Sequence, residues 1–291
     1  MDAVLYEWNH PPACGESRMH ELVNEDGVIC AAVDVLPEGG GAWAILVSWK
    51  PGVSGLPDAR AWNAAVESNL ARCRDLGAAA IDSRVVAACE GVPEALAAAR
   101  AALHRRTLAG LDFAQGEGRV EYRVGIDEAI AALEPGVAAP RLAWACVDAT
   151  DPDELARAAG FLRRAAEGDP AFRAGDDALG FLNNLLEEKG TAPAPERIQI
   201  GACDSVPAAF LALMAYPADG WSTLYYLGVA PGFRGRGLGA EAMLRGLRCL
   251  KAMGGTTYHD GTGSRNAPAR ALFARLGRPP YRVLEEWRLE K

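Results

Sequence analysis

The stretch LYYLGVAPGFRGRGLGA, residues 224–240, joins three kinds of local structure within a short length of chain. Its apolar, aromatic beginning predicts a β-strand, the Pro-Gly pair predicts a turn, and a loop rich in glycine and arginine then opens into a helix. Gly235, Gly237 and Gly239 lack a Cβ, so a ligand can approach their backbone N–H groups closely. The helix start adds unpaired N–H groups and the positive end of the helix dipole. The stretch therefore predicts a cradle for a phosphate or pyrophosphate.

Positive charge is concentrated around this loop. Residues 224–291 contain 12 Lys or Arg and 5 Asp or Glu, although the whole chain has a net charge of −8. Arg234 and Arg236 can donate charge-assisted hydrogen bonds to phosphate oxygens. A basic segment on an acidic chain suits a small polyanion, whereas the acidic remainder would repel a long nucleic acid. We therefore expect a small anionic ligand and no nucleic-acid partner.

Length and composition indicate a globular protein with two domains. Half of the 291 residues are apolar, and no uncharged apolar run approaches the roughly 18 residues that cross a bilayer, so no membrane partner is expected. Residues 1–10 include acidic side chains and no basic region, which is unlike a signal peptide. Seven scattered cysteines without a C-x-x-C pair indicate free thiols in a reducing compartment and no metal site. These features predict a cytoplasmic monomer or homodimer.

The second half of the chain shows a regular order of elements. The residues DPDE at 151–154 are typical of a helix start, with a carboxylate at the N-cap, Pro at N1 and Glu at N3. The predicted order is β-α-α-β-β-β-α-β-α-β. The strands are expected at 141–147, 197–203, 208–216, 224–229, 256–260 and 281–291, and the helices at 151–162, 178–189, 238–253 and 266–276.

The first half repeats this pattern in a degenerate form. Residues 28–52 match the pattern of residues 209–232, with two prolines 14 residues apart in each, which indicates an internal duplication. In place of the glycine-arginine loop stands VSGLPDARAW, residues 53–62, with one glycine and an extra proline. The elements expected after it are helices at 59–76 and 94–108, a strand at 79–85 and a closing strand at 119–124. We therefore predict a structural or interface domain at 1–138 and a ligand-binding domain at 139–291.

The loop and a second motif resemble the GNAT superfamily of N-acetyltransferases. Residues 234–239, RGRGLG, match the family signature Q/R-x-x-G-x-G/A at every fixed position. The motif N-x-x-A-x-x-L-Y-x-x-x-G is matched at four of its five fixed positions. The resemblance is clear over 197–291, fair over 141–196 and weak over 1–135. The residues aligned with the second motif are Asn266, Ala269, Leu272, Phe273 and Gly277, and Phe273 stands where the motif has tyrosine.

The resemblance implies an α/β (α+β) fold of two GNAT-like domains, each a mixed, mostly antiparallel twisted sheet flanked by helices, with the N-terminal domain truncated. It also implies acetyl-CoA as co-substrate. The pyrophosphate would bind the glycine-arginine loop, the pantetheine would follow strand 224–229, and a backbone N–H of that strand would polarise the thioester carbonyl. Asn266 would contact the pantetheine or cap its helix. The implied cofactor-binding residues are Leu227, Gly228, Val229, Arg234, Gly235, Arg236, Gly237, Leu238, Gly239, Ala240, Asn266 and Phe273.

Acetyl transfer to an amine requires a base, or a water relay to one, because the nucleophile is the neutral amine. Many relatives carry a glutamate on the strand before the glycine loop, but this strand has none. His259 and Asp260, at the end of the next parallel strand, are the alternative candidates. Tyr225 and Tyr226 would line the acceptor pocket or pack in the core, and Tyr225 is the third catalytic candidate.

Phe273 departs from the family pattern. Relatives usually have a tyrosine at this position, which protonates the departing thiolate, and phenylalanine carries no such proton. Either the thiolate leaves unassisted, or Tyr258, Tyr281 or a water replaces the tyrosine, or activity is low. The choice among these is open at the level of sequence.

The predicted function is acetyl-CoA-dependent transfer of an acetyl group to a primary amine of a small molecule or peptide, directly within a ternary complex. One alternative is a CoA-binding protein with weak catalysis. Another is a dinucleotide-binding oxidoreductase, because Gly235, Gly237 and Ala240 also fit G-x-G-x-x-G/A, and Asp260 ends a strand about 20 residues later.

Overall fold

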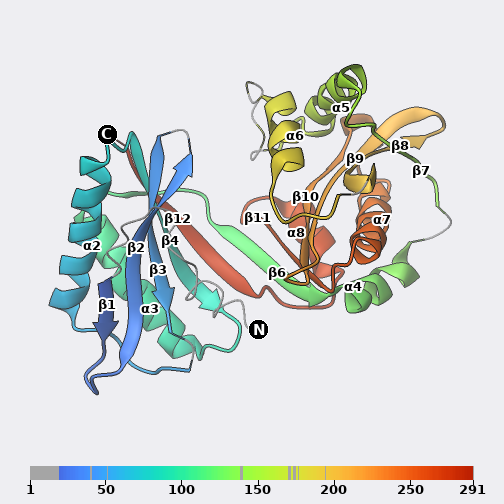
Figure 1. Cartoon of the computed structure of the whole chain (residues 1–291). Helices are drawn as coiled ribbons and strands as arrows, with labels where there is room; N and C mark the ends of the chain where they lie inside the picture. The colour runs from blue at the N-terminus through green and yellow to red at the C-terminus, as the bar shows by residue number, and fades with distance from the viewer. Residues whose placement is uncertain are drawn as a thin grey trace. The chain divides into compact units, whose positions relative to one another are not determined.

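The protein divides into two compact units, described here from a computed structural model (Figure 1). The described residues are 20–39, 41–50, 52–137, 140–169, 172, 175, 177–193 and 195–290. The first unit comprises residues 1–120 and 281–291, and the second comprises residues 121–280. The expected domains at 1–138 and 139–291 have other bounds. Residues 121–138 belong to the second unit. The C-terminal strand belongs to the first unit, because it pairs with the strand at residues 80–89.

The first unit contains a mixed sheet in the strand order β1-β2-β3-β4-β12. All neighbouring pairs are antiparallel except β3 and β4, which are parallel. A two-residue strand, β5, adds to β12. The strands are β1 (His20–Val23), β2 (Ile29–Gly39), β3 (Ala42–Trp49), β4 (Ala80–Cys89), β5 (Ala114–Gln115) and β12 (Arg282–Glu290).

Two helices, α2 (Ala59–Asp75) and α3 (Glu94–Gly110), pack on this sheet. Asp58 caps α2, with its carboxylate accepting from the N–H groups of Arg60 and Ala61 at 3.0 Å each. Trp62 of α2 is fully buried and stacks on Trp49, with ring centroids 5.3 Å apart. The apolar face of α2 therefore helps to form the core of the first unit.

The strands of the second unit follow the order β6-β11-β10-β9-β8-β7 and are also of mixed direction. The pairs from β7 to β10 are antiparallel, and β10 and β11 are parallel. The predicted mixed, mostly antiparallel sheet is confirmed. The strands are β6 (Arg119–Gly125), β7 (Ala143–Cys146), β8 (Ile198–Cys203), β9 (Val206–Tyr216), β10 (Trp221–Val229) and β11 (Thr257–Gly263).

Helices cover both faces of this sheet. Alternate side chains of β9, including Phe210 and Met214, are buried in one cluster with α5 and α6. Leu213 points to the other face, where it and Leu224 lie close to Gly246 of α7. Four of these helices, α5, α6, α7 and α8, lie near their predicted positions. The helices of the unit are α4 (Ile126–Leu133), α5 (Pro152–Ala165), α6 (Ala178–Glu187), α7 (Leu238–Ala252) and α8 (Ala267–Ala274).

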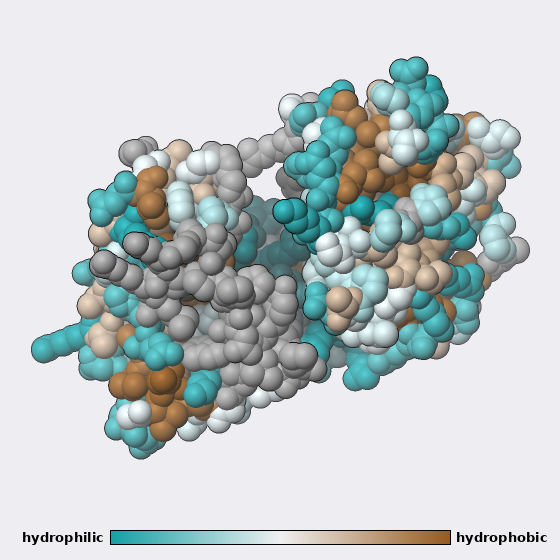
Figure 2. Space-filling view, in the orientation of Figure 1, coloured by the Kyte–Doolittle hydropathy of each residue, from teal (hydrophilic) through white to brown (hydrophobic). Residues whose placement is uncertain are grey.

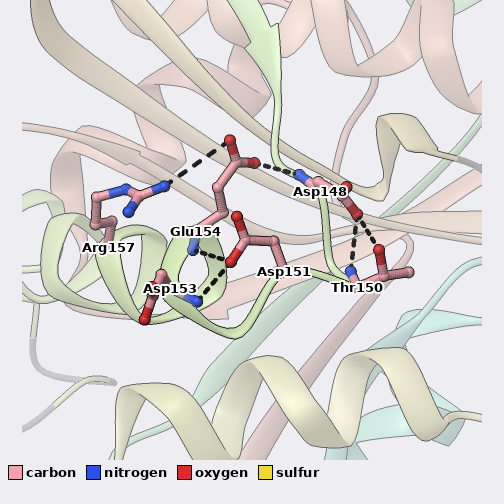
Figure 3. Close-up of polar contacts among 6 residues, drawn as sticks. All are labelled: Asp148, Thr150, Asp151, Asp153, Glu154 and Arg157. Atoms are coloured by element: carbon pink, nitrogen blue, oxygen red, sulfur yellow. Dashed lines mark hydrogen bonds and ion pairs between the residues drawn. The ribbon is translucent and has the colours of Figure 1, made fainter.

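The start of α5 shows the predicted capping (Figure 3). Asp151 accepts hydrogen bonds from the N–H groups of Asp153 at 2.8 Å and Glu154 at 3.3 Å, and Pro152 occupies N1. Glu154 turns back and accepts from the N–H of Asp148 at 2.7 Å. The N-cap and the acidic N3 residue therefore fix where the chain enters the helix.

The helix α4 is absent from the sequence-based prediction. Its N-cap is Gly125, which offers no side-chain hydrogen bond, so the usual start signal is missing.

In the part of the chain that the structure describes, no helix is both long and apolar enough to span a bilayer.

Candidate functional site

The strands β10 and β11 part from one another after a short paired segment. Their parallel pairing is limited to Trp221 opposite Thr257 and Ser222 opposite Tyr258. The register of β10 against β9 then shifts between Thr223 and Tyr226. Beyond this irregularity β10 stays paired with β9 as far as Val229, so its other edge faces away from that partner. Alternate backbone groups of β10 are thereby directed to an open edge.

The loop after β10 exposes a row of backbone N–H groups. A 3₁₀ turn (Pro231–Phe233) leads to Gly235 and Gly237, with φ of +75° and +80°, conformations that glycine adopts without strain. Gly237 is the N-cap of α7 and has no side chain with which to cap it. Among the described residues, none accepts a hydrogen bond from the N–H groups of residues 235–239. These groups and the helix dipole form an anion cradle.

The two arginines of the loop have different surroundings. Arg234 donates to the carbonyls of Val229 at 2.8 Å, Ala165 at 3.1 Å and Glu167 at 2.6 Å. Its guanidinium therefore joins the loop to the end of α5, and the phosphate contact expected from sequence stays a prediction. The guanidinium of Arg236 lies over the Phe233 ring, 5.4 Å from its centroid. Both arginines are at exposed positions.

Arg141 and Glu241 contact each other, and Arg141 also contacts the loop. Neither residue was among those predicted from the sequence. Glu241, buried in the first turn of α7, accepts from the N–H groups of Arg141 at 2.9 Å and Leu142 at 2.7 Å. Nη2 of Arg141 donates to the carbonyl of Arg236 at 2.6 Å. No local sequence signal links two residues 100 positions apart, so only the fold identifies the pair.

The predicted base candidates, His259 and Asp260, both lie on β11. Asp260 accepts hydrogen bonds from the Tyr258 hydroxyl at 2.8 Å and from the N–H of Gly261 at 2.7 Å. Burial, with Asp260 next in importance, holds the pKa of Tyr258 well above its usual range. Nε2 of His259 lies 3.7 Å from Oε2 of Glu121, a residue of β6. The two candidates therefore have different partners.

Phe273 is part of a buried stack of aromatic rings. It lies parallel to Tyr122, with centroids 4.6 Å apart and planes at 5°, and 6.4 Å from the ring of Tyr258. Asn266 caps α8 by accepting from the N–H of Ala269 at 3.2 Å, which is one of the two roles expected for it. Tyr281, an expected substitute proton donor, belongs to the first unit.

The two tyrosines of β10 have separate roles. The Tyr226 hydroxyl donates to Asp169 at 3.1 Å, and burial, followed by Asp169, raises the pKa of this phenol. Tyr225 is 37% exposed, and its ring lies 4.7 Å from that of Phe181 in α6. Leu179 of α6 is similarly exposed. Figure 2 shows hydrophobic surface on the second unit in the region of α5 and α6. Tyr225 therefore lies at the surface beside α6.

A metal-binding group is not found among the described residues: no three His, Cys, Asp or Glu side chains lie together in a suitable arrangement. The donors gathered at this site are backbone N–H groups and arginines, which suit an anion.

The second unit combines a mixed sheet, two parallel strands that part from one another and a glycine loop at a helix N-terminus. Residues 159–277 match the model of the Acetyltransferase (GNAT) family. This match covers the glycine-arginine loop, His259, Asn266 and Phe273. The alternative of a dinucleotide-binding domain is disfavoured, because β10 follows β9 in an antiparallel pair.

Solved structures of similar fold cover nearly the whole chain. A tandem GNAT protein from the clavulanic acid biosynthesis pathway has 16% identity and a TM-score of 0.57, and the match covers 96% of this chain and 85% of that one. A GCN5-related N-acetyltransferase from Sphaerobacter thermophilus matches with 16% identity, a TM-score of 0.57 and coverage of 99% and 84%. One from Kribbella flavida has 15% identity, a TM-score of 0.54 and coverage of 92% and 89%. Curated protein sequences give no significant match.

Proposed function

We propose that the protein is an acetyl-CoA-dependent N-acetyltransferase that transfers the acetyl group to a primary amine of a small molecule or peptide. Transfer takes place directly, within a ternary complex of donor, acceptor and protein. The observation that carries this proposal is the row of N–H groups at residues 235–239, which have no acceptor among the described residues and adjoin the open edge of β10.

The donor site fits the chemistry of a nucleotide pyrophosphate. Gly235 has no atom within 4 Å of the place where a Cβ would stand, so the loop has room for a ligand. The N–H groups of residues 235–239 would bind the phosphate oxygens, and Arg236 would add a charge at the rim. When bound, acetyl-CoA supplies a thioester that an amine can attack. A backbone N–H at Leu227, Gly228 or Val229 would polarise the thioester carbonyl.

His259 is the preferred base for the amine. Its side chain is 31% exposed, so substrate can reach it, while the carboxylate of Asp260 is engaged by Tyr258. Imidazole accepts a proton near neutral pH and is suited to this role. Tyr225, exposed beside α6, would contact the acceptor on the same strand that holds the thioester.

Calorimetric titration with CoA, acetyl-CoA and NADH tests the donor assignment. We expect CoA and acetyl-CoA to bind with similar affinity and NADH to bind at least about 100-fold more weakly, because the proposed donor is acetyl-CoA. Binding of NADH without binding of CoA would refute the acetyltransferase and support the oxidoreductase.

Release of free thiol across a panel of amines tests the reaction. His259→Ala is expected to lower turnover by about 100-fold or more and to leave CoA affinity unchanged, because the base acts on the amine. His20→Ala, on β1 of the first unit, is the matched control and should keep full turnover. Equal turnover in both variants would remove His259 from the mechanism.

A second candidate function, CoA binding without efficient transfer, is favoured by one observation. Phe273 carries no proton for the leaving thiolate, and its face is covered by Tyr122. CoA binding in the calorimeter together with no thiol release from any amine would select this candidate.

A further inference from the structure

We propose that Glu121 is a positioning residue for His259, so that the proton-accepting group of the second unit depends on strand β6. This inference rests on the proposed function, in which His259 is the base. Glu121 was not a candidate in the sequence, because it stands 138 positions before His259 and within the half that lacks the glycine loop.

The alternation of side chains places Glu121 and His259 on the same face of the sheet. The strands β6 and β11 are hydrogen-bonded neighbours. Tyr122 of β6 and Tyr258 of β11 both pack near Phe273, on the face covered by α8. Since successive residues of a strand point to opposite faces, the preceding residue of β6 and the following residue of β11 point away from α8. The distance of 3.7 Å between their side chains agrees with this.

Burial gives the carboxylate of Glu121 a strong reason to have a cationic or donating partner. Glu121 is only 8% exposed, and a buried carboxylate is costly unless it is paired or hydrogen-bonded. His259 is the more exposed member of the pair, with 31% of its side chain exposed against 11% for Glu121. The two side chains are within ion-pair distance, so a small movement would allow the carboxylate to accept a hydrogen bond from the imidazole.

Two effects of Glu121 on the reaction follow. A carboxylate beside Nε2 favours the tautomer with hydrogen on Nε2, in which Nδ1 carries the lone pair that accepts a proton. The same contact also restricts the orientation of the imidazole ring. Glu121 touches neither the donor nor the acceptor in this scheme, so its effect falls on kcat and not on donor affinity.

The experiment measures the imidazole directly. Long-range ¹H–¹⁵N NMR of the full-length protein, at a pH where the ring is neutral, reports the tautomer of His259, whose signals are assigned by their loss in His259→Gln. We expect the Nε2–H tautomer in the wild type and a mixture in Glu121→Leu, which fills the same space without an acceptor. Glu121→Gln should retain the tautomer, because its amide oxygen still accepts, but it removes the charge.

Kinetics of the same variants separate positioning from folding. We expect kcat for an amine acceptor to fall roughly 10- to 100-fold in Glu121→Leu and less in Glu121→Gln, while the Kd for CoA stays within about twofold. Glu121→Asp should recover part of kcat. The matched control is Glu285→Gln, which removes a carboxylate from β12 that pairs with Arg105 at 2.6 Å in the first unit. It should change neither the tautomer nor kcat.

The outcomes distinguish this inference from the function on which it rests. An unchanged tautomer in Glu121→Leu, in a protein that still binds CoA, overturns the positioning role whatever the turnover. If the wild type acetylates no amine, but Glu121→Leu still changes the tautomer of His259 as expected, the proposed function is overturned. The pairing of Glu121 with His259 is then still supported.

Discussion

In each unit one helix connects two parallel strands: α2 connects β3 and β4, and α7 connects β10 and β11. The N-termini of these two helices differ. In the first unit, Asp58 is the N-cap of α2, and its carboxylate accepts from the N–H groups of Arg60 and Ala61. In the second unit, Gly237 is the N-cap of α7 and has no side chain to offer. The N–H groups of the first helical turn are therefore capped in the first unit and remain available to a ligand in the second. The N-cap residue is thus one of the differences between the two helix starts.

The surroundings of each helix start also differ between the units. The parallel pairing of β3 and β4 stops at Ile45, as that of β10 and β11 stops early in the second unit. In the first unit Arg100, the seventh residue after the N-cap of α3, donates to the carbonyl of Val53 at 2.7 Å and lies 4.8 Å from the Trp49 ring centroid. The seventh residue after the N-cap of α8 is Phe273, which stays within its aromatic stack. In the first unit, the side chain of Arg100 therefore occupies the region beside Val53 and Trp49.

Gly237→Asp should produce the largest effect, because it gives α7 the carboxylate cap that α2 has. A negative side chain at the cradle competes with the phosphates, and we expect CoA affinity to fall by about 100-fold, roughly 2.8 kcal/mol. Gly237→Asn has nearly the same shape, tolerates the left-handed conformation and carries no charge, so its loss should be clearly smaller. Isothermal titration calorimetry measures both. Equal losses would show that space, and not charge, determines the affinity.

Acidification should lower the stability of the first unit because of His104, which, unlike His259, is almost fully buried. Burial lowers the pKa of His104 to about 3, and the residue is 1% exposed. Because the unfolded chain takes up a proton near pH 6.5 and the folded one does not, stability falls as pH decreases from about 6.5 towards 3. The slope is at most about 1.4 kcal/mol per pH unit.

Hydrogen exchange of the α3 amides at several pH values measures this loss. His104→Gln should flatten the pH dependence, since it removes the titrating group. The same slope in the variant and the wild type would assign the acid sensitivity to other groups.

Asp58→Ala should have the smallest effect of the three, about 1 kcal/mol of lost stability in the first unit, because it leaves the first N–H groups of α2 without their cap. CoA affinity of the whole protein should not change, because the cradle lies in the second unit. Chemical denaturation and calorimetry together check both statements. A gain of a second CoA site in Asp58→Gly would show that the N-cap alone had suppressed binding there.

Local signals predicted most of the elements of the second unit. The N-cap at Asp151, the glycine loop and the apolar periodicity of α7 all act within a few residues, so the sequence displays them directly. The helix α4 escaped prediction because Gly125 gives it no side-chain cap. The bounds of the units also differ, because strand pairing joins segments that are far apart in sequence and leaves no local trace.

The candidate site shows the same division. The loop at 234–239, His259, Asn266 and Phe273 could be recognised from residue type and spacing. The engagement of Arg234 by three carbonyls, that of Asp260 by Tyr258 and the contact of Glu121 with His259 could not, since each depends on where a side chain meets a distant segment.

The sequence by itself determined that one of the two duplicated halves has an anion loop, because glycine spacing, arginine content and the helix start are properties of consecutive residues. Only the tertiary structure decided which charged groups are available to act there and which are held by the fold. Burial and hydrogen bonding depend on contacts between strands, and those contacts are set by the packing of the whole unit.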